Sequence, residues 1–146
     1  MAPHRLRLHK GLREWLVVPD TNFLLVPGQF GVDIVSELNR ILDVKFKIVV
    51  PNVVLQELDV IERKTRGKDL LAVRMAKELA ERFETVEIGE FGERPIDDQI
   101  YDFAVKNDRV IVCTNDKGLK KRLRERGVPV VYLRSRKILE LEGVVG

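Results

Sequence analysis

Short apolar runs alternate along this chain with longer stretches in which apolar residues recur at helical spacing. The runs are rich in Val and Ile, and four of the five are continuous, which is typical of strands buried on both faces. They span residues 15–18, 47–50, 85–88, 110–113 and 128–133. Strands of this kind that are separated by helices form parallel βαβ units with helices on both sides. The pattern therefore predicts an α/β fold.

The connections between these runs have the periodicity of amphipathic helices. The predicted helices span residues 34–42, 53–61, 70–80, 96–105 and 118–126. Pro51 suits the first turn of the second helix, where a missing N–H costs nothing. Residues 65–68 contain Gly67 and separate the second helix from the third.

The size and composition of the chain exclude several classes of protein. Its 146 residues, 45% hydrophobic and 34% charged, suit one soluble domain, which we place at residues 14–146. Its longest apolar runs are far shorter than the roughly 20 residues of a membrane span. The lone Cys113 excludes a disulfide framework and a Cys-rich zinc site. A basic leader at residues 1–13 lacks the apolar region of a signal peptide, so we expect a cytoplasmic protein.

Acidic side chains follow the predicted strands. Asp20 comes directly after the first strand, Glu57 lies two turns into the helix after the second, and Asp116 comes just after the fourth. Open parallel sheets bind ligands at the carboxyl ends of their strands, where the strand order reverses. Asp97 and Asp98 begin the helix that leads to the fourth strand. We expect that helix to start from the opposite end of the sheet, so that these two residues must overhang the sheet edge.

A convergent group of carboxylates indicates a divalent cation. Carboxylates held together raise one another's pKa unless a cation compensates their charge, and oxygen ligands favour Mg²⁺ or Mn²⁺. Such an ion can activate water and stabilise the leaving oxygen of a phosphodiester. The arrangement therefore predicts hydrolysis of nucleic acid.

Each acid also has a structural interpretation. Asp20, Asp97 and Asp116 all lie where a helix starts, and aspartate is a common N-cap residue. Glu57 is compatible with a solvated helix face. Only the joint position of these acids at one sheet edge favours catalysis.

Four segments of the chain carry a family resemblance. They are VVPDTNFL at 17–24, PNVVLQEL at 51–58, IDDQI at 96–100 and VCTNDKGL at 112–119. Over about residues 15–134 the chain resembles PIN-domain ribonucleases, and it is most similar to their Fcf1/Utp24-type branch in its archaeal form. Pro19 departs from the family pattern, which usually has an apolar strand residue there. The leader also extends beyond the usual start, either as an RNA-binding arm or through a misassigned start codon.

The resemblance implies a three-layer α/β sandwich with a five-stranded parallel sheet flanked by helices. It also implies an endoribonuclease that depends on Mg²⁺ or Mn²⁺. The residues that match the catalytic and metal-binding positions are Asp20, Glu57, Asp97 or Asp98, and Asp116. The residues that match supporting polar positions are Thr21, Asn22, Thr114 and Asn115.

Basic residues are concentrated in two segments, although the net charge is only +3. A polyanion must be drawn toward carboxylates that would otherwise repel it, so these segments are candidates for RNA binding. The candidates are Arg63, Lys64, Arg66, Lys68, Lys117, Lys120, Lys121 and Arg124. The alternative for residues 117–126 is a solvated helix face. Because aromatic residues make up only 6% of the chain, we expect contacts with the RNA backbone more than readout of its bases.

Three functions are compatible with these features. The first is an endoribonuclease that acts on ribosomal RNA precursors, which the branch resemblance favours. The second is a toxin ribonuclease paired with an antitoxin, and the third is a catalytically silent module that binds RNA or a ribosome-assembly partner. Members of the family are often homodimers, and the apolar stripe at 70–80 is a candidate interface.

Overall fold

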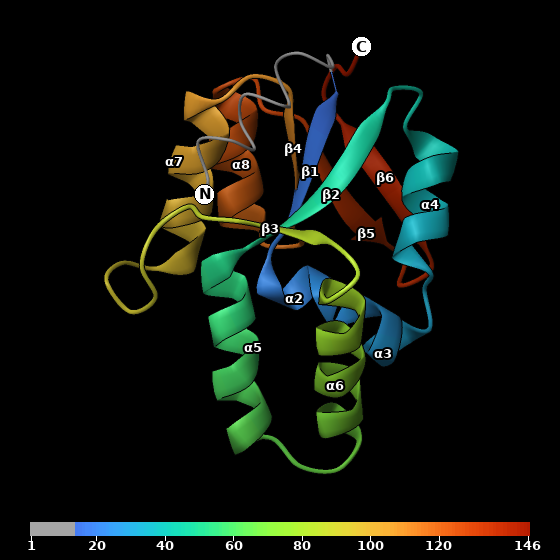
Figure 1. The fold of residues 1–146 in the computed structure, drawn as a ribbon. Helices are drawn as coiled ribbons and strands as arrows, with labels where there is room; N and C mark the ends of the chain where they lie inside the picture. Colours follow the sequence, from blue (N-terminus) through green and yellow to red (C-terminus); the bar gives the residue numbers. More distant parts are fainter. Residues whose placement is uncertain (1–13) are drawn as a thin grey trace.

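A computed structural model describes residues 14–146, and the predictions made for the leader at 1–13 lie outside the described residues. The chain forms a six-stranded sheet in the order β3-β2-β1-β4-β5-β6 (Figure 1). Its first five strands run parallel and the sixth is antiparallel to β5. The strands are β1 (Trp15–Pro19), β2 (Phe46–Pro51), β3 (Glu84–Val86), β4 (Val110–Cys113), β5 (Val130–Arg134) and β6 (Ile138–Glu142). The predicted α/β fold is confirmed, with one strand more than expected.

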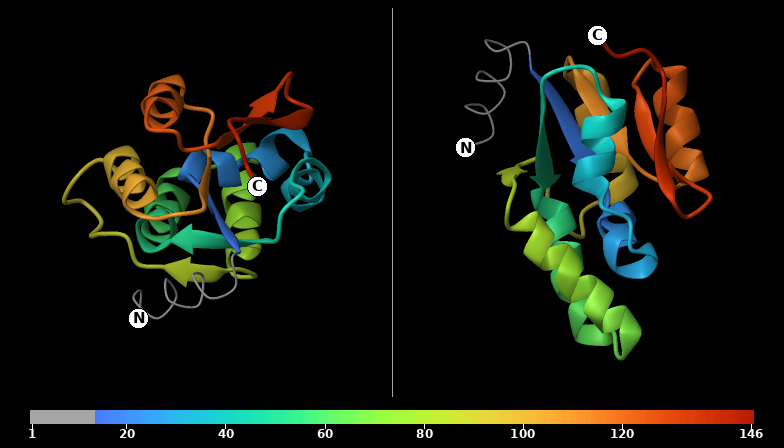
Figure 2. Two further views of the ribbon diagram at one scale, coloured as in Figure 1. Left: turned by 90° about the horizontal axis from the view of Figure 1, so that it is seen from above. Right: turned by 90° about the vertical axis from the view of Figure 1, so that its right-hand side faces the viewer.

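Seven helices accompany the sheet in the described part of the chain. They are α2 (Thr21–Leu24), α3 (Val26–Phe30), α4 (Ile34–Ile41), α5 (Asn52–Lys64), α6 (Lys68–Ala80), α7 (Ile96–Lys106) and α8 (Lys117–Glu125). The five longer helices match the predicted ones, whereas α2 and α3 were not predicted. Figure 2 shows α7 and α8 on the opposite side of the sheet from α4, as right-handed crossovers require when the strand order reverses. In Figure 1, α5 and α6 lie side by side beyond the carboxyl ends of the strands.

The reversal of strand order lies between β1 and β4. The chain builds β1, β2 and β3 outward in one direction and then returns to place β4 on the other side of β1. The register pairs Val18 with Val112 and Pro19 with Cys113, so the two strands end at the same level. The residues that follow them, starting with Asp20 and Thr114, therefore leave the sheet together.

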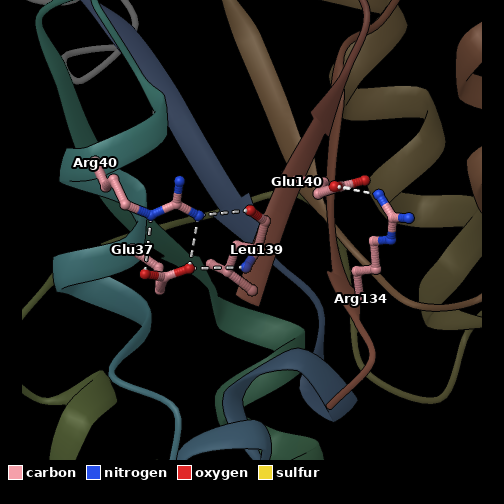
Figure 3. Close-up of polar contacts among 5 residues, drawn as sticks. All are labelled: Glu37, Arg40, Arg134, Leu139 and Glu140. Carbon is pink, nitrogen blue, oxygen red and sulfur yellow. Dashed lines mark hydrogen bonds and ion pairs between the residues drawn. The ribbon is translucent and has the colours of Figure 1, made fainter. Parts of the chain in front are cut away.

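The unpredicted strand β6 is held to the sheet by β5 and to the rest of the domain by α4. Glu37 of α4 accepts a hydrogen bond from the Leu139 N–H (2.9 Å), and Arg40 donates to the Leu139 carbonyl (3.2 Å) and to Glu37. Across the sheet, Arg134 of β5 pairs with Glu140 of β6 at 2.7 Å (Figure 3). The side chain of Leu139 is 1% exposed. This edge is therefore fixed by both polar and apolar contacts.

Burial divides the apolar stripe of α6 into two faces. Val73 and Ala76 lie in the core, whereas Leu71 and Met75 are 61% and 49% exposed. The homodimer interface expected for this helix stays a prediction. Within residues 14–146, none of the helices has both the length and the apolar character needed to cross a bilayer.

Candidate functional site

A pocket of about 330 Å³ opens at the carboxyl ends of the strands, next to the point where the strand order reverses. Its walls come from the start of α2, from the middle of α5 and from the start of α7. The lining residues are Asp20, Thr21, Asn22, Glu57, Pro95, Ile96 and Asp97. The pocket thus collects residues from three of the four motif segments, and the fourth contributes through the charge of Asp116.

Asp20 directly follows the carboxyl end of β1 and is only 5% exposed. It is the N-cap of α2, where its Oδ1 accepts a hydrogen bond from the Phe23 N–H at 2.8 Å. Its Oδ2 accepts from the hydroxyl of Thr114. Burial raises the pKa of Asp20 to about 6; the negative charges of Asp97 and Asp116 add to the rise, and the two hydrogen bonds oppose it.

Thr114 links the ends of β1 and β4. Its hydroxyl oxygen donates to Asp20 and also accepts a hydrogen bond from the Asp116 N–H at 3.1 Å. Asp116 in turn is the N-cap of α8 and accepts from the Leu119 N–H at 2.8 Å. Asn115 points elsewhere, because its Oδ1 accepts from the Leu133 N–H of β5. Thr114 therefore supports the acids directly, whereas Asn115 anchors their loop to β5.

The structure separates the two neighbouring aspartates of α7. Asp97 lines the pocket and its pKa is raised, first by burial and then by the charges of Asp116, Asp98 and Glu57. Asp98 instead accepts a hydrogen bond from Arg122 of α8 at 2.8 Å. The expectation that this helix starts from the opposite end of the sheet was wrong. Because β3 is parallel to β2, residues 87–95 continue from its carboxyl end and α7 starts at the same edge as α2 and α8.

Two amide side chains that the sequence analysis missed hold the loop at 87–95. Asn52, the first residue of α5, donates to the Gly89 carbonyl (2.8 Å) and accepts from the Ile88 N–H (2.9 Å). Gln99 of α7 donates to the carbonyls of Glu90 and Arg94. A Cβ on residue 89 would collide with the end of the Gln99 side chain, so any larger residue there would displace Gln99 from its hydrogen bonds to the loop. The only signal in the sequence is that Gln99 is a polar residue directly before the buried Ile100.

The basic residues predicted to bind RNA fall into two groups. Lys120 and Arg124 pair with Glu142, and Lys120 also lies 3.8 Å from the centre of the Tyr132 ring. These two residues therefore tie α8 to β5 and β6. Among residues 14–146, no carboxylate pairs with the remaining six, which are exposed at the α5–α6 turn and along α8. They are Arg63, Lys64, Arg66, Lys68, Lys117 and Lys121.

The side-chain atoms of the pocket that could bind a metal ion are oxygens, which suit a hard divalent cation. Its charged groups are all carboxylates, and the hydroxyl oxygen of the buried Thr21 has no hydrogen-bond partner within the described residues. Within residues 14–146, however, no three His, Cys, Asp or Glu side chains are already gathered closely enough to form a metal site. Asp20, Glu57 and Asp97 line one pocket, and the charges of Asp97 and Asp116 raise the pKa of Asp20, which keeps its hydrogen bonds from Phe23 and Thr114.

Comparisons with known proteins agree with this geometry. The model of a family described as PIN like domain matches residues 17–136. Ribonuclease VapC4 from Methanocaldococcus jannaschii is 35% identical over 131 residues, which cover 88% of this chain and 98% of that protein. The rRNA-processing protein fcf1 from Schizosaccharomyces pombe is 32% identical over 123 residues, which cover 84% of this chain and 60% of that protein. The solved structure of the PIN domain endonuclease Utp24 matches with a TM-score of 0.70 and 29% identity, covering 89% of this chain and 92% of that one.

Proposed function

This chain belongs to the PIN-like domain family, and from that premise we propose that it is an endoribonuclease that requires Mg²⁺ or Mn²⁺. One observation carries the proposal: Asp20, Asp97 and Asp116 come from three separate segments, yet Asp97 and Asp116 both raise the pKa of the buried Asp20, and Asp116 also raises the pKa of Asp97. Holding negative charges this close to a buried carboxylate is unfavourable unless a cation compensates them.

Asp20, Asp97 and Asp116 would hold the ion, and Glu57 lines the same pocket with its charge acting on Asp97. Asp97 is proposed as the ligand from α7, because Asp98 is already paired with Arg122. When bound, the ion supplies positive charge that activates water and stabilises the leaving oxygen of the phosphodiester. Thr114 holds Asp20 in place and holds the backbone next to Asp116, so it would act by positioning both acids.

A circular RNA substrate tests this proposal directly, because a circle has no ends and can be opened only by an endonuclease. We expect the purified chain to linearise it with Mn²⁺ or Mg²⁺ and to leave it intact with EDTA. Asp116→Asn keeps an N-cap acceptor for α8 and should abolish cutting. Asp43→Asn, an exposed acid at the amino-terminal edge of β2, is the matched control. Equal cutting by wild type and Asp116→Asn would refute the assignment, and tight RNA binding without cleavage would favour a silent binding module.

For the biological role we propose processing of ribosomal RNA precursors. The support is the structural similarity to the endonuclease Utp24 and the sequence similarity to an rRNA-processing protein. Depletion of the protein should then lead to accumulation of an uncut rRNA precursor, which primer extension would detect.

A second role, as the ribonuclease of a toxin–antitoxin pair, is supported by the similarity to VapC4 over nearly that protein's full length. In that case induced expression should arrest growth, and co-expression of a small protein from the adjacent gene should relieve the arrest.

A further inference from the structure

A second pocket, of about 310 Å³, lies at the same sheet edge but at the far side from the acids. One wall is residues 30–37, from the end of α3 to the start of α4, and the other is Arg136 and Lys137 in the turn between β5 and β6. In Figure 1, α2 and α3 run from the lower end of β1 toward this turn. The segment that begins at Asp20 therefore ends at the second pocket.

The carboxylates in this pocket are occupied by contacts within the protein. Asp33 caps α4 and accepts hydrogen bonds from the backbone N–H and the hydroxyl of Ser36. Glu37 accepts from both Arg40 and the Leu139 N–H (Figure 3). Among residues 14–146, no carboxylate pairs with Arg136 or Lys137, and both are exposed. The two acids of the lining therefore already have hydrogen-bond partners, and Arg136 and Lys137 are its charged groups that a phosphate could pair with.

An exposed aromatic ring lies beside these cations. Phe30 is 41% exposed, although Phe23, one helix earlier, is fully buried. The guanidinium of Arg136 lies over the Phe30 ring, 5.7 Å from its centre. An aromatic face next to unpaired cations is the combination that single-stranded nucleic acid binds, through base stacking and phosphate contacts.

Ser135 and Arg136 are the two central residues of the turn that joins β5 to β6, and both have the positive φ that a type I′ hairpin turn requires. Ser135 and Arg136 have φ values of 54° and 58°, a region that favours glycine or asparagine. The Lys137 N–H closes the turn on the Arg134 carbonyl at 3.1 Å. A glycine at residue 136 would adopt this geometry more easily, so the arginine is kept at some cost in stability.

We propose that this second pocket binds one nucleotide of a single-stranded RNA whose cut phosphodiester lies at the acidic pocket, with Phe30 stacking on the base and Arg136 and Lys137 contacting phosphate. This inference rests on the proposed nuclease function. Asn115 accepts from the Leu133 N–H and so joins the loop of Asp116 to the strand that leads into the turn. The two pockets are therefore linked by α2 and α3 on one side and by β5 on the other.

The test measures equilibrium binding of labelled oligouridylates of increasing length to the full chain by fluorescence anisotropy, in EDTA so that RNA stays intact. We expect Arg136→Ala and Phe30→Leu each to weaken binding of the longer oligomers about tenfold, in line with the value of one stacked base. Binding of the shortest oligomers should not change. Lys45→Ala removes an exposed cation just before the amino-terminal end of β2, away from both pockets. It should leave the affinity for oligomers of every length within about twofold of wild type.

Arg136→Gly separates binding from folding. We expect it to raise Tm, because glycine relieves the positive φ, and to lose as much RNA affinity as Arg136→Ala. If Arg136→Ala and Phe30→Leu both bind RNA like Lys45→Ala, the inference is wrong. If polyglutamate displaces RNA at matched charge and Phe30→Leu has no effect, the pocket recognises an acidic peptide and the inference is again wrong.

Cleavage kinetics distinguish failure of this inference from failure of the proposed function. If wild type cuts the circular RNA and Arg136→Ala raises KM for long substrates with kcat unchanged, both proposals are supported. If wild type cuts and Arg136→Ala has the wild-type KM, only the second pocket is refuted. If wild type binds RNA through the second pocket but never cuts it with either metal, the nuclease proposal fails alone.

Discussion

Asp20 and Asp33 perform the same local task in very different surroundings. Each is the N-cap of the helix that follows it, and each accepts a hydrogen bond from the backbone N–H three residues on. Each also accepts from a hydroxyl, Thr114 for Asp20 and Ser36 for Asp33. Burial raises the pKa of Asp20 to about 6, whereas the hydrogen bonds from Ser36 lower the pKa of the exposed Asp33.

The difference between them lies in the partners that come from elsewhere in the chain. The hydroxyl on Asp33 is three residues away in sequence, whereas the hydroxyl on Asp20 comes from the neighbouring strand, 94 residues away. Asp97 and Asp116 add their charges only at Asp20. A helix cap therefore becomes a candidate catalytic group only where the sheet topology buries it and brings other acids to it.

The largest contrast should appear in RNA cleavage. Asp20→Asn keeps a capping acceptor but removes the charge, and we expect at least about a hundredfold loss, because even the partners of metal ligands are worth about 10- to 100-fold. Asp33→Asn makes the same change at the matched cap and should stay within about twofold of wild type. Initial rates with Mn²⁺ on a labelled RNA too short to reach the second pocket, which Asp33 lines, measure both. Equal losses would show that both caps act only through folding.

The two caps should also respond oppositely to pH in metal-free protein. Asp20 has a folded pKa of about 6, above the ordinary 3.8, so its contribution to the free energy of unfolding is fully present below 3.8 and is lost as pH rises through 6. The loss is about 3 kcal/mol. Asp33 has a lowered pKa, so its contribution is present at neutral pH and is lost as pH falls.

Urea unfolding in EDTA across this pH range, for wild type and each Asn variant, checks the sign. Asp20→Asn should gain stability over wild type as pH rises, and Asp33→Asn should lose it. A difference between Asp20→Asn and wild type that is independent of pH would contradict the burial argument.

A smaller contrast is expected between the neighbouring acids of α7. Asp97→Asn should lower the cleavage rate by about 10- to 100-fold, because Asp97 lines the pocket with Asp20. Asp98→Asn should cost only a few-fold, since Asp98 is held outside by Arg122. The Mn²⁺ concentration that gives half-maximal rate separates loss of a ligand from loss of packing. If Asp98→Asn lowers the rate more than Asp97→Asn, Asp98 and not Asp97 is the ligand from α7.

The smallest contrast is between the two hydroxyls. Thr114→Val removes a donor to the ionised form of buried Asp20, so it should move the cleavage pH profile upward and cost about 1 kcal/mol. Ser36→Ala removes an exposed hydrogen bond to Asp33 and should cost about 0.5 kcal/mol with an unchanged profile. A pH profile that does not move in Thr114→Val would mean that Thr114 serves stability alone.

The elements that the sequence predicted are those in which local pattern and burial agree. The parallel strands are covered on both faces, so they appear as continuous apolar runs. Strand β6 does not, because Ile138–Glu142 alternates with glutamates and follows a turn at Ser135 and Arg136 that has no glycine. The helices α2 and α3, of four and five residues, are too short to show a period.

The sequence predicted those residues of the candidate site that directly follow a strand. Asp20 and Asp116 follow neighbouring parallel strands, so their closeness depends only on the strand order. The position of Asp97 depends on the course of residues 87–95, which Asn52 fixes from a helix more than 30 residues earlier. Such a long-range contact leaves no local pattern, and the same holds for the pairing of Arg122 with Asp98.

Cys113 is the only cysteine of the chain, and it lies fully buried at the end of β4, beside the strand that leads to Asp20. Burial raises the pKa of its thiol well above the ordinary value, so the thiol is unreactive in the closed protein. A thiol reagent reaches it only when the centre of the sheet opens. The rate at which a reagent labels Cys113 under native conditions therefore reports how readily the sheet opens beside the strand that leads to Asp20.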